Sequence, residues 1–81
     1  MTVIVHFHSY FKDLTGCAQT TEAASPGSTV GDLHARLMDR FQELRKMRKS
    51  TLIAVGLEYQ PAAYVLKEGD EVSLFPPVQG G

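Results

Sequence analysis

The first pattern along the chain is an alternation of side chains over residues 3–8. One set of alternate positions is apolar, and the other mixes an isoleucine with two histidines: Val3, Val5 and Phe7 against Ile4, His6 and His8. A period of two is typical of a half-buried strand. Residues 9–16 then hold apolar side chains around Lys12 and Asp13 and end at Gly16. They predict a short helical turn that stops at a residue free to take a positive φ.

A weaker strand is predicted over residues 19–24, and a long helix after it. Thr20 and Thr21 provide little bulk, which indicates an edge strand. After a turn at residues 25–28, Thr29 and Asp32 have the spacing of a helix N-cap and an acidic first-turn residue. An apolar stripe follows at intervals of three and four residues: Val30, Leu33, Leu37, Phe41 and Leu44. We expect this single helix to run out at residues 45–49, where cations complement the negative end of its dipole.

The second half of the chain predicts two further strands. Residues 52–55 form a short β-type run, Pro61 interrupts the chain, and a turn at residues 68–70 leads into a strand at residues 72–75. The order is therefore strand, strand, helix, strand, strand, which predicts an α+β fold of the ubiquitin-like β-grasp type. We expect a mixed sheet of four to five strands with one main helix on one face, formed by residues 1–75, and a flexible C-terminal tail of residues 76–81.

Length, charge and cysteine content restrict the function classes. The 81 residues suffice for one small domain, and the net charge of -1 favours neither nucleic acid nor a membrane surface as a partner. The longest apolar run, residues 52–57, is too short to span a bilayer, and the start of the chain does not resemble a signal peptide. Because Cys17 is the only cysteine, a reducing, cytoplasmic location is expected. No metal site is predicted, because His6 and His8 lack an evident third ligand.

The tail is the most informative segment for chemistry. Pro76 has no amide for a strand partner, and Pro76-Pro77 favours an extended course. At about 3.1 Å per residue, residues 76–81 could carry the last carboxylate roughly 18 Å beyond the sheet. Gly80 and Gly81 have no Cβ, so such an end could pass through a narrow channel. A free α-carboxylate is a poor electrophile until one oxygen becomes a leaving group such as AMP, and the resulting acyl-adenylate could accept sulfur as a thiocarboxylate.

These residues resemble a known family, the small sulfur-carrying subunit of molybdopterin synthase within the ubiquitin-like ThiS/MoaD family. The resemblance rests on the turn Gly-Asp-Glu-Val at residues 69–72 and the tail Phe-Pro-Pro-Val-Gln-Gly-Gly at residues 75–81. Supporting matches are Phe7 and the run Lys-Asp-Leu-Thr-Gly at residues 12–16. The chain departs from the family pattern at Gln79, where a small residue is common, and at Gly56, where an asparagine is common.

The resemblance implies a sulfur-transfer cycle. An adenylating enzyme of the ubiquitin-activating type would consume ATP to activate Gly81, and a sulfur donor protein would convert it to a thiocarboxylate. The large synthase subunit, in an expected heterotetramer, would pass the sulfur to cyclic pyranopterin monophosphate to form the molybdopterin dithiolene. The chain would bind no cofactor and would not be catalytic alone. Tail threading would involve Pro76, Pro77, Val78 and Gly80, and partner contacts would involve Phe7, Tyr59 and Phe75.

Several alternatives remain open at this point. Phe7 shares strand parity with Val3 and Val5, so it fits the core as well as an interface. The thiocarboxylate could serve thiamine, cysteine or tRNA thiolation, Gly81 could be joined to lysines as a protein modifier, or the chain could be an interaction module with an inert end. Cys17 is interpreted as structural, and residues 45–49 either form a solvated helix end or steer an acidic partner or phosphate.

Overall fold

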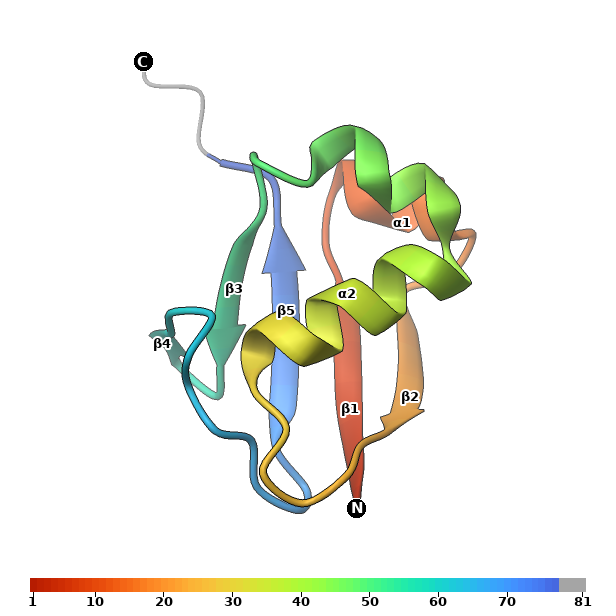
Figure 1. Ribbon diagram of the computed structural model, residues 1–81. Helices are drawn as coiled ribbons and strands as arrows, with labels where there is room; N and C mark the ends of the chain where they lie inside the picture. The colour runs from red at the N-terminus through yellow and green to blue at the C-terminus, as the bar shows by residue number, and fades with distance from the viewer. Residues whose placement is uncertain (78–81) are drawn as a thin grey trace.

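The computed structural model describes residues 1–77, which form a five-stranded sheet with helices against one face (Figure 1). The elements in chain order are β1 (Thr2–Phe7), α1 (Tyr10–Thr15), β2 (Gln19–Ala23), α2 (Val30–Arg40), the 3-10 helix η1 (Gln42–Met47), β3 (Leu52–Val55), β4 (Glu58–Tyr59) and β5 (Glu71–Phe75). The strand order across the sheet is β2-β1-β5-β3-β4.

The sheet is mixed, because only its central pair of strands is parallel. β1 and β5 run parallel, with Val5 opposite Val72 and Phe7 opposite Leu74. β2 pairs antiparallel with β1 at one edge, and β3 pairs antiparallel with β5 on the other side. The predicted α+β fold with one main helix is confirmed, and β2 is the edge strand that its sequence indicated.

The main helix begins where the sequence predicted. The Thr29 hydroxyl accepts from the Asp32 amide at 3.1 Å, and the Asp32 carboxylate accepts from the Thr29 amide at 3.0 Å, which together form a capping box. The helix then lies across the sheet (Figure 1), and its side chains Val30, Leu33 and Leu37 are buried in the core against the sheet. The largest fully buried side chains are those of Phe7, Phe11, Leu33, Leu37, Leu44, Leu74, Val3, Val5, Val30 and Val72.

The end of the helix differs from the prediction. α2 stops at Arg40, and Phe41 leaves the helical region with φ -121° and ψ 85° before η1 begins. The break lets the Phe41 ring meet Phe7 edge-on, with ring centroids 5.5 Å apart, while Leu44 still reaches the core at 1% exposure. The cations of residues 45–49 therefore do not cap α2, because they lie in η1 and in the turn beyond it.

One strand was not predicted as such. β4 pairs antiparallel with β3 through Val55 opposite Glu58 and Ala54 opposite Tyr59. The two residues between the strands are Gly56, at φ 62°, and Leu57. A glycine followed by one residue between two β-forming positions is a hairpin signal, and it brings Tyr59 next to the central strands.

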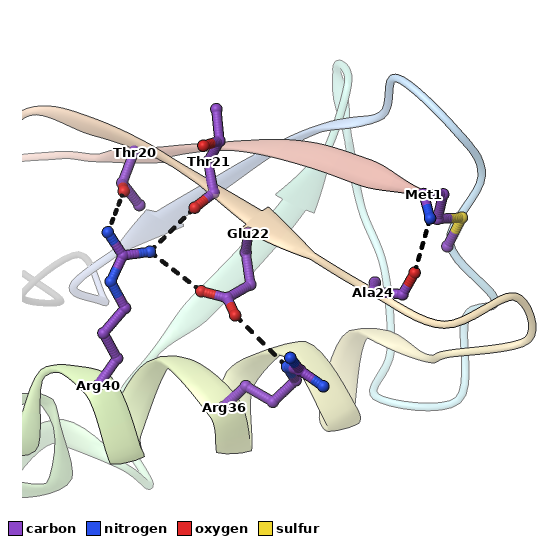
Figure 2. Close-up of polar contacts among 7 residues, drawn as sticks. All are labelled: Met1, Thr20, Thr21, Glu22, Ala24, Arg36 and Arg40. Carbon is purple, nitrogen blue, oxygen red and sulfur yellow. Dashed lines mark hydrogen bonds and ion pairs between the residues drawn. The ribbon is translucent and has the colours of Figure 1, made fainter.

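A polar cluster fastens α2 to the edge strand (Figure 2). Arg40 donates through Nη1 to the Thr21 carbonyl at 2.9 Å and to Glu22 Oε1 at 3.1 Å, and through Nη2 to Thr20 Oγ1 at 2.8 Å. Arg36 donates to Glu22 Oε2 at 3.4 Å. Because these bonds join helix and strand across the open side of β2, they hold the helix over the sheet and occupy a carbonyl of the edge strand.

The last strand ends at Phe75, directly before Pro76. The division into a domain of residues 1–75 and a tail of residues 76–81 stays a prediction, because residues 78–81 lie outside the described part of the chain. Within residues 1–77, no helix has the length and apolar character needed to cross a membrane.

Candidate tail exit and docking face

The sheet topology brings the termini of three strands together at one end of the sheet. β1 and β5 are parallel, so both end there, and β3, which is antiparallel to β5, begins there with Leu52 opposite Phe75. Beyond Phe75 the ladder stops, because neither Pro76 nor Pro77 has an amide to donate. Pro76 and Pro77 therefore leave the ladder at this end of the sheet, which we call the tail exit.

An aromatic group lies on the sheet face that α2 does not cover. The His8 ring stacks on Phe75 with centroids 4.4 Å apart and 12° between planes, and Tyr59 meets Phe75 edge-on at 6.2 Å and 78°. Tyr59 is 66% exposed, and Leu57 at the hairpin tip is fully exposed. Aromatic side chains that remain accessible beside one another are typical of a protein contact surface. We call this group, His8, Leu57, Tyr59 and Phe75, the docking face.

Two shallow hollows flank Leu57 on this face. One of about 250 Å³ is lined by Ala54, Gly56, Leu57, Tyr59 and Phe75, and is mostly apolar in composition. The other, of about 480 Å³, is lined by His6, His8, Gly56, Leu57, Glu71 and Ser73. His6 Nε2 and Glu71 Oε1 lie 2.9 Å apart in the second hollow. The face thus offers one hollow beside Phe75 near the tail exit and another, with the ionisable side chains of His6 and Glu71, toward the start of β5.

Phe7 is not part of the docking face. It is 2% exposed and lies in the core, opposite Leu74 on the helix-covered side of the sheet. Strand parity puts Phe7 on one face with Val3 and Val5, and the structure shows that α2 covers this face, whereas His6 and His8 lie on the other. Of the two alternatives for Phe7, core packing is correct. The expectation that Phe7 contacts a partner is wrong, because its side chain is buried.

The remaining candidate residues have separate positions. Cys17 is half-buried against the core, and its Sγ lies 3.7 Å from Thr15 Oγ1. In residues 1–77, no cluster of three or more histidine, cysteine, aspartate or glutamate side chains could hold a metal ion. Val78, Gly80 and Gly81, which the sequence assigns to threading and activation, lie outside the described residues, as does Gln79.

Sequence reasoning missed two members of the docking face. Nothing in the local sequence of His8 indicates a stack on Phe75, since His8 follows β1 and Phe75 ends β5, far apart in the chain. Leu57 could have been found from the Gly56-Leu57 hairpin signal, which places an apolar side chain at an exposed turn.

A family model described as the ThiS family matches residues 5–81. The chain belongs to the ThiS family. The family resemblance predicted from the turn and tail motifs is thereby confirmed. This ThiS family chain is 29% identical over 70 residues to the molybdopterin synthase sulfur carrier subunit of Arabidopsis thaliana, covering 86% of this chain and 73% of that protein.

Solved structures show the same β-grasp fold. SAMP1 from Haloferax volcanii superposes with a TM-score of 0.90 over the full length of both chains at 20% identity, which supports the fold alone. A protein-protein complex of subunits 1 and 2 of molybdopterin-converting factor from Helicobacter pylori contains a chain that matches with a TM-score of 0.72 at 26% identity, over all of both chains.

Proposed function

We propose that this chain is the sulfur carrier of molybdopterin synthase and that Gly81 bears the transferred sulfur. The observation that carries the proposal is the family match through residue 81, together with a sheet that ends at Phe75 and is followed by two prolines. This combination supports a folded body that presents a short extension to other proteins. The curated relatives named as molybdopterin synthase sulfur carrier subunits support this pathway over thiamine, cysteine or tRNA thiolation.

The proposed chemistry has two steps at the terminal carboxylate. A carboxylate oxygen attacks the α-phosphorus of ATP on the adenylating enzyme, which forms an acyl-adenylate and releases pyrophosphate. A hydrosulfide ion delivered by the donor protein then attacks the carbonyl carbon, so that a C–S bond forms, the C–O bond to AMP breaks, and AMP leaves with the electron pair of that bond. The product is a thiocarboxylate, and no side chain of the carrier takes part. ATP is thus a substrate of the activating enzyme, and the carrier itself holds no cofactor.

The large subunit is the proposed acceptor. The complex of subunits 1 and 2 from Helicobacter pylori supports a partner of this kind. The large subunit would seat the docking face, with Tyr59 and Phe75 as anchors, while Pro76, Pro77, Val78 and Gly80 lead the terminus into its active site. There the sulfur would pass to cyclic pyranopterin monophosphate on groups that the large subunit provides. We place these steps in the cytoplasm, where ATP is available, and in a heterotetramer of two large and two small subunits.

The intact mass of the protein from its native cell tests the carrier function directly. Exchange of one oxygen for sulfur at the terminus adds about 16 Da to a chain that ends at Gly81. We expect this species to accumulate when the large subunit is absent and to disappear when the adenylating enzyme is absent.

A variant that keeps one additional residue after Gly81 is the matched control, since its last glycine carries an amide in place of the carboxylate. Sulfur incorporation into that variant, or a native mass that never shows the increment, would refute the proposal. Isopeptide adducts of higher mass would instead indicate a protein modifier.

A further inference from the structure

Basic side chains gather beside the tail exit, and the proposed function does not yet use them. Residues 45–49 contain Arg45, Lys46, Arg48 and Lys49, all of them exposed. Figure 1 shows η1 and the turn after it at the same end of the molecule as the end of β5. We call these four residues the basic segment.

The fold holds the basic segment close to the tail exit. Lys49 precedes Leu52 by three residues, which span at most about 10 Å, and Leu52 pairs with Phe75. The turn is tied closed, because the Ser50 amide donates to the Met47 carbonyl at 2.9 Å and the Thr51 hydroxyl donates to the same carbonyl at 2.6 Å. The positions of these cations are therefore set by the sheet register.

The four cations of the basic segment differ in whether an acidic side chain pairs with them. Arg45 pairs with Asp39 at 2.7 Å and Lys46 with Glu43 at 2.8 Å, and the hydrogen bond with Glu43 raises the pKa of Lys46. No ion pair among residues 1–77 involves Arg48 or Lys49. Because α2 ends at Arg40, these two cations also do not complement the dipole of the main helix.

The opposite end of the sheet carries charge of the other sign. Glu68, Asp70 and Glu71 lie just before or at the start of β5, and the cations at this end are Lys67 and the N-terminal amine of Met1. Since β5 leads from this acidic end to the tail exit, the charge of the described residues changes from negative to positive along β5. A partner with an acidic surface would attract the tail exit and repel the far end.

We infer that Arg48 and Lys49 bind an acidic protein surface around the channel that receives the tail on the adenylating enzyme. This rests on the proposed function and assigns a second contact to it, separate from the docking face. The pair would orient the carrier so that its terminus arrives first. The Debye length is about 8 Å at physiological ionic strength, so these cations attract a partner's carboxylates only when the two surfaces are close. Added salt should therefore weaken this attraction strongly.

Pyrophosphate exchange by the adenylating enzyme, with the carrier as the varied substrate, tests the inference. Lys49→Glu at the tail exit and Lys67→Glu at the far end change the net charge equally and are a matched pair. At low ionic strength we expect Lys49→Glu to raise the KM for the carrier about fivefold, and Arg48→Glu combined with Lys49→Glu about twentyfold, with kcat nearly constant. Lys67→Glu should change KM less than about twofold, and about 0.5 M salt should remove the differences.

Three results would overturn the inference while leaving the carrier function intact. One is an equal effect of Lys49→Glu and Lys67→Glu, another is an effect that persists at high salt, and the third is a change in the KM for ATP alone, which would assign the cations to nucleotide phosphate. Thermal unfolding of each variant shows whether it is folded under the assay conditions. If the wild-type chain supports no exchange that depends on Gly81, the proposed function fails, and this inference fails with it.

Discussion

Phe75→Ala tests the docking face with the packing between α2 and the sheet left in place. Phe75 is half-buried, stacks on His8 and contacts Tyr59, but it lies on the sheet face opposite to α2. Its truncation therefore removes part of the proposed partner contact and leaves the packing between helix and sheet intact.

The expected cost to folding is moderate. A Phe-to-Ala change in a core costs about 3–5 kcal/mol, whereas Phe75 loses two aromatic contacts worth about 0.5–1.5 kcal/mol each and only part of its buried area. We expect a loss of about 1–3 kcal/mol, or a fall in Tm of roughly 4–24 °C for a domain of this size. The expected cost to binding is of the same size, because an aromatic anchor at the centre of an interface contributes about 2 kcal/mol or more, which is about thirtyfold in Kd.

Calorimetric titration of the large subunit, well below the Tm of every variant, measures this effect. Phe7→Leu is the control, because Phe7 is 2% exposed and lies in the core. It should cost about 1–2 kcal/mol of stability and change Kd by less than about twofold. The assignment of the docking face is refuted if Phe75→Ala binds like the wild type, or if Phe7→Leu weakens binding as much as Phe75→Ala.

Three further changes have distinct expected outcomes. Gly80→Val should have a Tm within about 2 °C of the wild type, since Gly80 follows the last strand. It should slow adenylation or sulfur transfer about a hundredfold, because the added side chain would not fit a narrow channel; wild-type rates in both steps would contradict threading. Cys17→Ala should cost about 1 kcal/mol or less in denaturant unfolding and keep sulfur transfer, and loss of transfer in the folded variant would indicate chemistry at the thiol. Burial lowers the pKa of His34 from its ordinary value of 6.5, so the unfolded chain takes up a proton that the folded chain does not as the pH falls through that value. The free energy of unfolding should therefore fall below about pH 6.5, and His34→Gln should reduce this fall; an identical pH profile for both proteins would contradict it.

Local physical chemistry in the sequence was enough for most of the fold. The alternation over residues 3–8 predicted β1 and its two faces, because successive side chains of any strand point to opposite sides. Thr29 and Asp32 predicted the start of α2, because a capping box uses only atoms within one helical turn. Gly16 predicted the end of α1 for the same reason, and its φ of 77° is the left-handed value that a glycine adopts without strain.

The tertiary structure decided what depends on residues far apart in the chain. The stripe through Phe41 and Leu44 has helical spacing, and no glycine or proline marks a break, so only packing against Phe7 shows that α2 ends at Arg40. The composition of the docking face likewise depends on strand register, which places Phe75 beside His8 and Tyr59. Alternation divides each strand into two faces, but it does not say which face a helix covers. Which face becomes the core depends on the pairing between strands and on the side on which α2 crosses the sheet. Both depend on contacts among residues from every part of the core.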